Sequence, residues 1–493
     1  PEMQHSWATP DGIFRIHYDT EGPRAVYHPD EDIDPPDGIP DYVNRLSEFL
    51  HYSYQVFIVE LNYDLPPEDG ESGGDSLYDI YLTDVPALTS PESPSNQYPG
   101  RPAYTSYMQL GRDMRTPRYP DDPYPFLKVS AAHEYFHAVQ FAYRAYSMDA
   151  TPWWFESCAA WAEEMVFDEI NDVYYDLPDY LSQLHFSLYL TEGPFIYGSW
   201  LFPQFLSEKI GPQIIRKCWE KFASFSFAME AIRLTFSEFG FDFNEEYCRH
   251  IVWNYFTGSN YRPGFYQEAA FFNETVYEPR IHYGYPIEWM QQPVDQQNVS
   301  GAYIAFQKPQ INKGSLVIEY YNPTDDDHSV CIAVVRNSSA VEYDIYSVQN
   351  RVYTDFTITD FAECEKVIMM PVWGYEGLPI EGLTSYIYRA YIDTTLTSVS
   401  DDYAGPAEFE LMGAYPNPFN RSVSIVFDTP VRDKYEIRIY DVNGRLVLSR
   451  PGWCDPGLNR VNWTTPKDLA GGVLFYEVKL GSSKHRGKML YLK

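Results

Sequence analysis

The sequence predicts an α+β domain over residues 1–290, followed by two all-β domains of the sandwich type. At 493 residues, the chain is too long for one ordinary hydrophobic core. Strand-like alternation near the N-terminus gives way to helical periodicity, and short β segments dominate from residue 294 onward. Residues 398–408 are polar and rich in Asp, Gly and Pro, which is typical of a linker between a sandwich domain at 294–397 and a last domain at 409–493.

The first domain begins with strands and ends in helices. Its alternating segments predict strands, its apolar residues at helical spacing predict helices, and breaks in the helical pattern fall near Gly193, Gly211 and Gly240. The expected strands are 12–18, 77–82 and 102–110, and the expected helices are 41–61, 126–146, 152–167 and several more up to residue 257.

The two C-terminal domains show only short apolar segments between turn residues, as sandwiches do. The expected strands include 303–306, 316–320 and 331–335 in the first of them, and 423–427, 435–440 and 473–480 in the second.

Composition and charge exclude some classes of function. The hydrophobic fraction of 44% is that of a folded protein, and the net charge of −34 argues against nucleic-acid binding. No run of eighteen apolar residues predicts a transmembrane segment. The 44 tyrosines suit a carbohydrate- or protein-binding surface, or fill half-buried β positions. The six cysteines lack a CxxC pair and are compatible with disulfides or with buried thiols.

The most informative motif is His-Glu-Tyr-Phe-His at residues 133–137. On a helix, His133 and His137 share a face and can bind one zinc ion, with Glu134 beside it as the general base. A catalytic site needs a third protein ligand. Glu156 follows His137 by 19 residues, which allows a second helix to cross the first.

Glu156 opens the pattern Glu-x-x-Ala-x-Trp-x-Glu, which resembles the second motif of gluzincin metallopeptidases. The resemblance implies a zincin-like metallopeptidase domain in which Glu156 is the third zinc ligand and Glu134 activates water. These families often carry an acidic residue four positions later, where this chain has Ala160. Glu163 and Glu164 are the candidates to orient a histidine instead, with surface solvation as the alternative.

Two further parts of a gluzincin site are expected by the same resemblance. Tyr197 is the candidate donor that stabilises the oxyanion of a tetrahedral intermediate, although its spacing to Gly198 is unusual. The segment 103–108 precedes the motif helix, as the substrate-binding edge strand does in zincins, so an extended peptide would pair with it.

An acidic loop near the N-terminus suits calcium, which prefers six or more oxygen ligands. A solvated acidic turn is the alternative, because the spacing is not that of an EF-hand. The phrase at residues 37–43 also resembles one in a family of secreted bacterial metallopeptidases first catalogued in myxobacteria. The candidate ligands are Asp30, Asp32, Asp34, Asp37 and Asp41.

The last domain carries three ordered motifs, at residues 415–420, 439–447 and 472–476. Their order and spacing resemble the C-terminal sorting domain of type IX secretion cargo, a small immunoglobulin-like β-sandwich. This resemblance implies export by the outer-membrane secretion machinery of a Gram-negative bacterium, followed by surface attachment or release. A plain accessory sandwich is the alternative.

Two functions follow from these patterns. The first is a secreted zinc metallopeptidase that hydrolyses peptide bonds in protein or peptide substrates. The second is an extracellular structural or adhesive protein, self-associating and built on the same scaffold.

Overall fold

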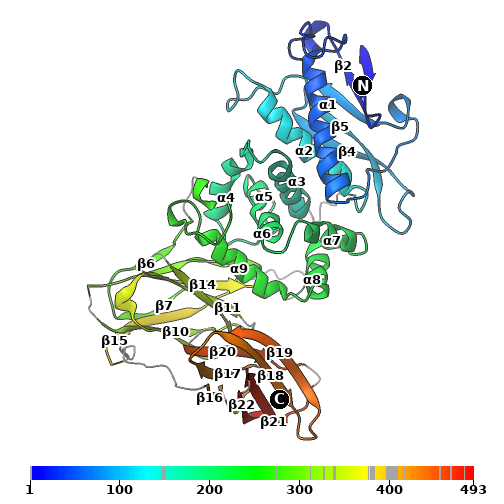
Figure 1. Cartoon of the computed structure of the whole chain (residues 1–493). Helices are drawn as coiled ribbons and strands as arrows, with labels where there is room; N and C mark the ends of the chain where they lie inside the picture. The colour runs from blue at the N-terminus through cyan, green and yellow to red at the C-terminus, as the bar shows by residue number, and fades with distance from the viewer. Residues whose placement is uncertain are drawn as a thin grey trace. The chain divides into compact units, whose positions relative to one another are not determined.

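A computed structural model describes the chain (Figure 1). Two compact units form, residues 1–396 and 397–493, and each is considered by itself. The predicted linker at 398–408 lies outside the described residues. The structure describes residues 3–145, 152–272, 276–310, 313–325, 328–336, 340–375, 377, 383–395, 409–415, 417–420, 422–454, 457–466, 469–481 and 483–492.

The first unit begins with a mixed five-stranded sheet in the order β1-β2-β3-β5-β4. Strands β2, β3 and β5 run parallel, while β1 and β4 are antiparallel to their neighbours. The strands are β1 (His5–Ala8), β2 (Phe14–Tyr18), β3 (Tyr78–Thr83), β4 (Ala87–Pro94) and β5 (Tyr104–Gly111).

The order corrects one prediction. The segment 103–108 was expected at the edge of the sheet, but β5 lies inside it and β4 is the edge strand. The reason is that β5 pairs with β3 on one side and with β4 on the other, with Ile80 and Thr89 opposite Met108, so β4 takes the outer position.

The unit also contains helices, of which α1 (Asp41–Tyr54) and α2 (Tyr124–Gln140) contact this sheet. The predicted helix 41–61 is α1 (Asp41–Tyr54) continued by a π-helical turn, η2 (Gln55–Glu60). The predicted helix 126–146 is α2 (Tyr124–Gln140), which ends early because Ala142 and Tyr143 donate to carbonyls only three residues back. The other helices are α3 (Pro152–Phe167), α4 (Leu177–Leu181), α5 (Phe195–Gly198), α6 (Leu201–Lys209), α7 (Gln213–Phe222), α8 (Ala228–Glu238) and α9 (Phe243–Tyr255), with short 3-10 turns η1 (Gly22–Arg24), η3 (Ser72–Gly74), η4 (Asp172–Asp176), η5 (Gly258–Asn260) and η6 (Ala269–Phe271).

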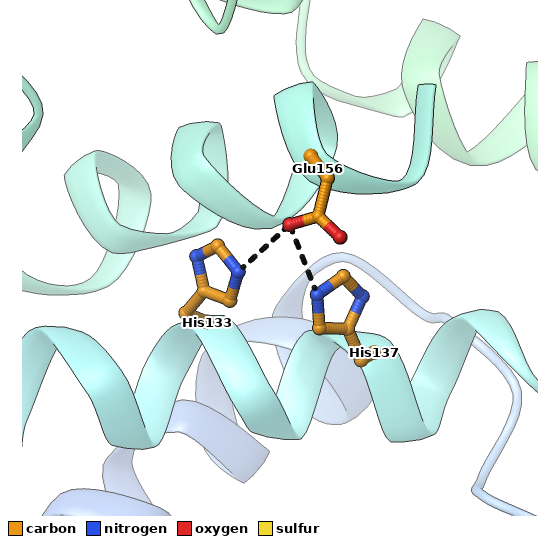
Figure 2. A group of neighbouring side chains, drawn as sticks. All are labelled: His133, His137 and Glu156. Carbon is orange, nitrogen blue, oxygen red and sulfur yellow. Dashed lines mark ion pairs between the residues drawn. The ribbon is translucent and has the colours of Figure 1, made fainter. Parts of the chain in front are cut away.

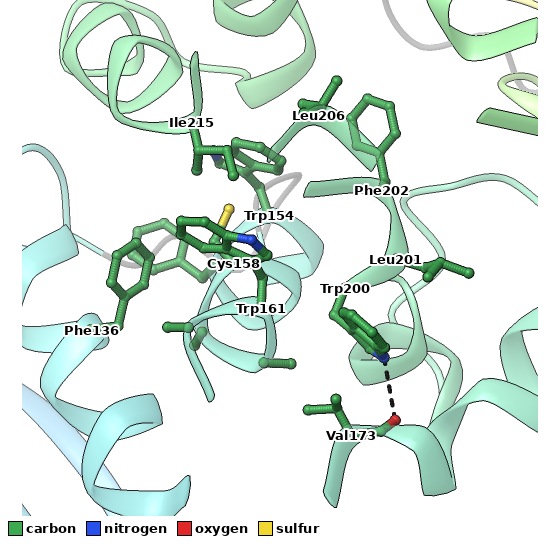
Figure 3. Packing of buried hydrophobic residues seen from close by; sticks show 14 of the residues in the cluster. Phe136, Trp154, Cys158, Trp161, Val173, Trp200, Leu201, Phe202, Leu206 and Ile215 are labelled. Carbon is green, nitrogen blue, oxygen red and sulfur yellow. Dashed lines mark hydrogen bonds between the residues drawn. The ribbon is translucent and has the colours of Figure 1, made fainter. Parts of the chain in front are cut away.

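Large aromatic side chains hold these helices together. Trp154 and Trp161 of α3 are fully buried, and Trp161 meets Phe136 of α2 edge-on at 6.0 Å between ring centroids (Figure 3). Burial of one such side chain stabilises the fold by roughly 1.5–3 kcal/mol. Buried aromatic contacts therefore pack α3 against α2.

The same unit continues into a two-sheet β-sandwich. One sheet has the order β13-β10-β15-β7, and the other has β12-β11-β14-β9-β6, with β8 paired to β14. The strands are β6 (Arg280–His282), β7 (Ile287–Gln291), β8 (Ser300–Gly301), β9 (Ile304–Gln307), β10 (Ser315–Tyr321), β11 (His328–Arg336), β12 (Val341–Val348), β13 (Tyr353–Ile358), β14 (Cys364–Trp373) and β15 (Ile387–Asp393), with the 3-10 turn η7 (Phe361–Glu363).

Strand β11 shows why the helices and the sandwich share one unit. Val330 and Ile332 face the core between the two sheets, whereas Cys331 and Ala333 face the core that includes the helices. Both faces of the strand are buried, which explains its unbroken apolar sequence. The sandwich thus packs directly on α9, and the predicted boundary at residue 290 falls inside a continuous apolar core.

The second unit consists of two antiparallel sheets around its own core, in the orders β16-β17-β20 and β19-β18-β21-β22. Both predicted β domains are thus β-rich, and the first domain combines a sheet with helices. The strands are β16 (Glu410–Tyr415), β17 (Ser422–Thr429), β18 (Asp433–Tyr440), β19 (Leu446–Cys454), β20 (Gly457–Thr464), β21 (Gly472–Leu480) and β22 (Ser483–Tyr491).

Candidate metal centre

Helices α2 and α3 bring three potential ligands to one point. The Nε2 atom of His133 lies 3.4 Å from Oε2 of Glu156, and the Nε2 atom of His137 lies 3.6 Å from the same oxygen (Figure 2). One nitrogen or oxygen from each residue lies within 4.8 Å of the others. The two histidines are one helical turn apart on α2, and Glu156 is on the first turns of α3, so the arrangement follows from the crossing of two helices.

Each imidazole is oriented by a second side chain. The Nδ1 atom of His133 is 2.8 Å from Oε1 of Glu163, and the Nδ1 atom of His137 is 2.7 Å from Oε1 of Gln140. Gln140 also donates from Nε2 to the carbonyl of Phe155 at 3.0 Å, so its amide oxygen must face the histidine. Both imidazoles therefore donate from Nδ1, and their Nε2 atoms face Glu156, where they can ligate a metal once they are unprotonated.

The structure places one of the two predicted acidic residues, Glu163, against His133, and places the other, Glu164, elsewhere. Glu163 follows Glu156 by two helical turns, so both lie on the face of α3 that meets His133. Glu164 projects about 100° away. Its carboxylate accepts from Tyr174 at 3.2 Å and belongs to a separate group with Asp168 and Glu268.

Burial and opposite charges act against each other at this centre. Burial lowers the pKa of His133, but hydrogen bonds to Glu156 and Glu163 outweigh it and hold that pKa well above its usual value. Burial alone would raise the pKa of Glu156, yet the two histidines keep it below the ordinary range. Burial raises the pKa of Glu163 to about 7, against the effect of His133. A divalent cation would take over the charge balance that the imidazolium groups otherwise supply.

Glu134 is placed beside the three ligands on α2. Its side chain is 6% exposed, and its Oε2 atom is buried with no hydrogen-bond partner among the described residues. The backbone carbonyl of Glu134 accepts a hydrogen bond from Thr89 of the edge strand β4, at 2.9 Å. The carboxylate thus has an oxygen available to a small polar ligand, and the motif helix is attached to the edge of the sheet.

Tyr197, the candidate oxyanion donor, lies on α5 near His133. The centroids of the two rings are 6.3 Å apart, and the tyrosine is 40% exposed. The neighbouring Gly198 permits this position, because a Cβ there would come within 2.5 Å of the carbonyl of Asp176. The phenol is therefore next to the candidate metal ligands and accessible from outside.

Two of these contacts were missed in the sequence. Gln140 follows His137 by three residues on the same helix, so the spacing could have indicated the contact. Thr89 had no such signal, because its contact with Glu134 depends on the order of strands in the sheet.

The structure does not gather the five aspartates of the N-terminal loop into a cation-binding group. Asp32 accepts hydrogen bonds from the backbone amides of Asp37 and Gly38, at 3.0 and 2.9 Å. Asp41 accepts from Ile33 and Asp34 in the same way. Neither these two nor Asp30 belongs to a cluster of close ligand atoms in the described part of the chain. The carboxylates close the loop on itself, and calcium stays an untested prediction.

The structure also shows the state of the six cysteines. All six are free and buried, which favours thiols that fill apolar space over disulfides.

One family matches the sequence. Residues 413–490 match the secretion system C-terminal sorting domain, so the last unit is a sorting domain of the type IX secretion system. The comparison with curated proteins finds no match. The resemblance of residues 1–290 to gluzincins, and that of the span from residue 37 to about residue 400 to the myxobacterial family, therefore stay predictions.

Solved structures match only in part. PorZ, a surface component of the type IX secretion system of Porphyromonas gingivalis, is 17% identical over 22% of this chain and 14% of its own, with a TM-score of 0.13. Latent dimeric PorU of the same organism is 9% identical over 40% and 32%, at 0.16. A GH2 β-galacturonidase of Eisenbergiella tayi is 9% identical over 39% and 35%, at 0.15. This chain spans well under two thirds of each, and similarity at this level indicates no function.

The sorting domain indicates where the protein is located. It indicates a secreted or cell-surface protein of Bacteroidetes-type bacteria that the type IX machinery exports. Among the described residues, no helix has both the length and the apolar character needed to span a bilayer.

Proposed function

We propose that this chain is a secreted zinc metallopeptidase of the gluzincin type. The observation that carries the proposal is the convergence of His133, His137 and Glu156 beside Glu134. Two imidazole nitrogens and one carboxylate oxygen are a donor set of catalytic zinc sites, which leave a further position open. The unpartnered Oε2 atom of Glu134 fits this interpretation, because a buried carboxylate oxygen needs a polar ligand such as water.

The residues then divide the work of peptide hydrolysis. Zinc at this position would polarise the scissile carbonyl and lower the pKa of a water molecule. Glu134 takes a proton from that water and passes it to the leaving amine. Tyr197 donates a hydrogen bond to the oxygen on which negative charge develops. Strand β4, at the edge of the sheet and in contact with the motif helix, offers backbone groups that an extended peptide can pair with.

The decisive experiment compares the wild type with Glu134→Gln. Zinc content is measured by elemental analysis, and hydrolysis is measured on casein and on a peptide library. The change keeps all three ligands but removes the general base, so we expect zinc to stay and the rate to fall by at least about a hundredfold. Glu192→Gln, the same change at an exposed glutamate, is the control and should keep full activity.

Two other results would argue against the peptidase proposal. Zinc bound by both proteins without hydrolysis by either would favour the extracellular structural or adhesive protein. Absence of zinc from the wild type, after dialysis against zinc, would refute the metal site itself.

A further inference from the structure

The outer face of one sheet of the sandwich carries a continuous aromatic surface. In the sheet β13-β10-β15-β7, Leu316 and Ile318 of β10 face the core, so Glu319 and Tyr321 face outward. Tyr321 is paired with Tyr353 of β13, and Glu319 with Arg389 of β15. We call the outward residues Trp289, Glu319, Tyr321, Tyr353 and Arg389 the aromatic platform.

The rings of the platform are in contact with one another. Tyr321 and Tyr353 stack with their centroids 4.4 Å apart, and Trp289 of β7 meets Tyr353 edge-on at 5.7 Å. Residues from the two opposite edges of the sheet therefore touch across its outer face. Tyr353 is 62% exposed and Trp289 is 37% exposed, so the rings are available to a ligand.

Polar groups hold the rings in place and border them. The guanidinium of Arg389 lies 5.0 Å from the centroid of Trp289 and also binds Glu319 through two hydrogen bonds, at 2.8 and 2.9 Å. Trp289 is thus fixed from one side by a cation–π contact. The arginine and the glutamate neutralise each other, and both keep hydrogen-bonding atoms at the border of the rings.

From this arrangement we propose that the platform binds a neutral polysaccharide. A pyranose ring has an apolar C–H face that packs on an aromatic ring, and hydroxyl groups at its rim that hydrogen bond to guanidinium and carboxylate groups. Tyrosine and tryptophan provide such contact area with little loss of conformational entropy.

Charge favours a neutral occupant over the alternatives. The whole chain carries −34, so a second copy and a polyanionic glycan are both repelled. The platform has a compensated ion pair in place of a free cation. A neutral polysaccharide meets no such penalty, and the sorting domain takes the protein to the cell exterior, where such polymers occur.

The test is affinity electrophoresis of the full chain through native gels. The gels contain hydroxyethyl cellulose, xyloglucan or glucomannan as neutral probes, and polygalacturonate as an anionic one. We expect retardation by at least one neutral polymer. The double change Trp289→Ala and Tyr353→Ala should raise the dissociation constant by about tenfold or more, since each ring contributes of the order of a stacking contact.

Three controls make the result decisive. Tyr261→Ala removes an aromatic ring that is also 37% exposed, just after the turn η5, and should bind as the wild type does. Tyr353→Ala alone changes the most exposed ring, and circular dichroism checks that each variant is folded. Sedimentation velocity of the wild type and the double variant detects self-association through this face.

Each outcome of these measurements either supports or overturns the proposal of polysaccharide binding. No retardation by any neutral polymer, or equal retardation of the double variant, overturns the proposal. A dimer that only the double variant loses, without an effect of polysaccharide, also overturns it in favour of a contact between copies. Neither zinc nor Glu134 enters the measurement, so this proposal and the peptidase proposal fail independently.

Discussion

Replacement of Gln140 tests whether the two helices hold the metal centre as described. Its amide accepts from Nδ1 of His137 and donates to the carbonyl of Phe155, the residue before Glu156. One side chain thus orients a ligand on α2 and connects it to the turn of α3 that carries another ligand. Gln140→Leu removes both hydrogen bonds, whereas Gln140→Glu keeps an acceptor for the histidine and removes the donor.

The structure gives the size of the effects. Gln140 is 1% exposed, so Gln140→Leu leaves a buried imidazole N–H without its acceptor, which costs about 1–3 kcal/mol. The lost hydrogen bond to Phe155 adds about 1 kcal/mol. Loss of a residue that orients a ligating histidine typically weakens metal binding by about 10–100-fold. Gln140→Glu should retain zinc affinity within a few-fold, because a carboxylate also orients imidazole, but it should lose stability.

The assay is a competitive zinc titration against a chromophoric chelator, together with urea unfolding of the zinc-free protein. Zinc affinity falls in Gln140→Leu only, and the free energy of unfolding falls in both variants. Wild-type zinc affinity in Gln140→Leu would refute the orienting role. An equal loss of affinity in both variants would show that the contact with Phe155, rather than the one with His137, positions the ligands.

Further predictions concern Tyr197, Glu164 and the sorting domain. Tyr197→Phe should lower kcat by about a hundredfold while KM and zinc content stay unchanged, and a rise in KM alone would contradict the oxyanion role. Burial, followed by Asp168 and Glu268, raises the pKa of Glu164 to about 9, so the folded state holds this proton more tightly than the unfolded chain. Stability is then lost as pH rises from the ordinary carboxyl range toward 9. Glu164→Gln should raise the free energy of unfolding at pH 9 by on the order of 1 kcal/mol, with a smaller gain near pH 4. If the melting temperatures of the wild type and the variant depend on pH in the same way, this prediction is wrong. Removal of residues 409–493 should leave the chain inside a Bacteroidetes host, and an unchanged amount outside the cells would contradict export through this domain.

Local patterns predicted much of the metal centre. His133 and His137 are four residues apart on one helix, and helical spacing alone places them on one face. The predicted helix 152–167 is α3 to the residue, which supports the placement of Glu156 on its first turns. Glu163 is two turns from Glu156, so its contact with His133 also follows from periodicity. Each of these inferences uses distances within one or two helices.

Other parts of the site depend on how elements pack. The edge position of β4 and the contact of Thr89 with Glu134 follow from strand order, which alternation of side chains does not encode. Which of Glu163 and Glu164 contacts His133 depends on how α3 is rotated about its axis, and the sequence does not specify that rotation. In the acidic loop, too, the contacts of Asp32 and Asp41 with backbone amides depend on the folded shape of the loop, which the spacing of the aspartates does not show.

The sequence by itself determined the nature of the elements, the residues of the candidate metal centre and the identity of the sorting domain. These depend on periodicity and on short motifs, in which neighbours along the chain are neighbours in space. Only the tertiary structure decided that the helices and the sandwich form one unit, that Gln140 connects the two helices, and that Trp289, Tyr321 and Tyr353 meet on one sheet face. Those contacts join residues from separate strands and helices. They form because of the packing free energy of the whole core, and a local sequence pattern holds no information about that free energy.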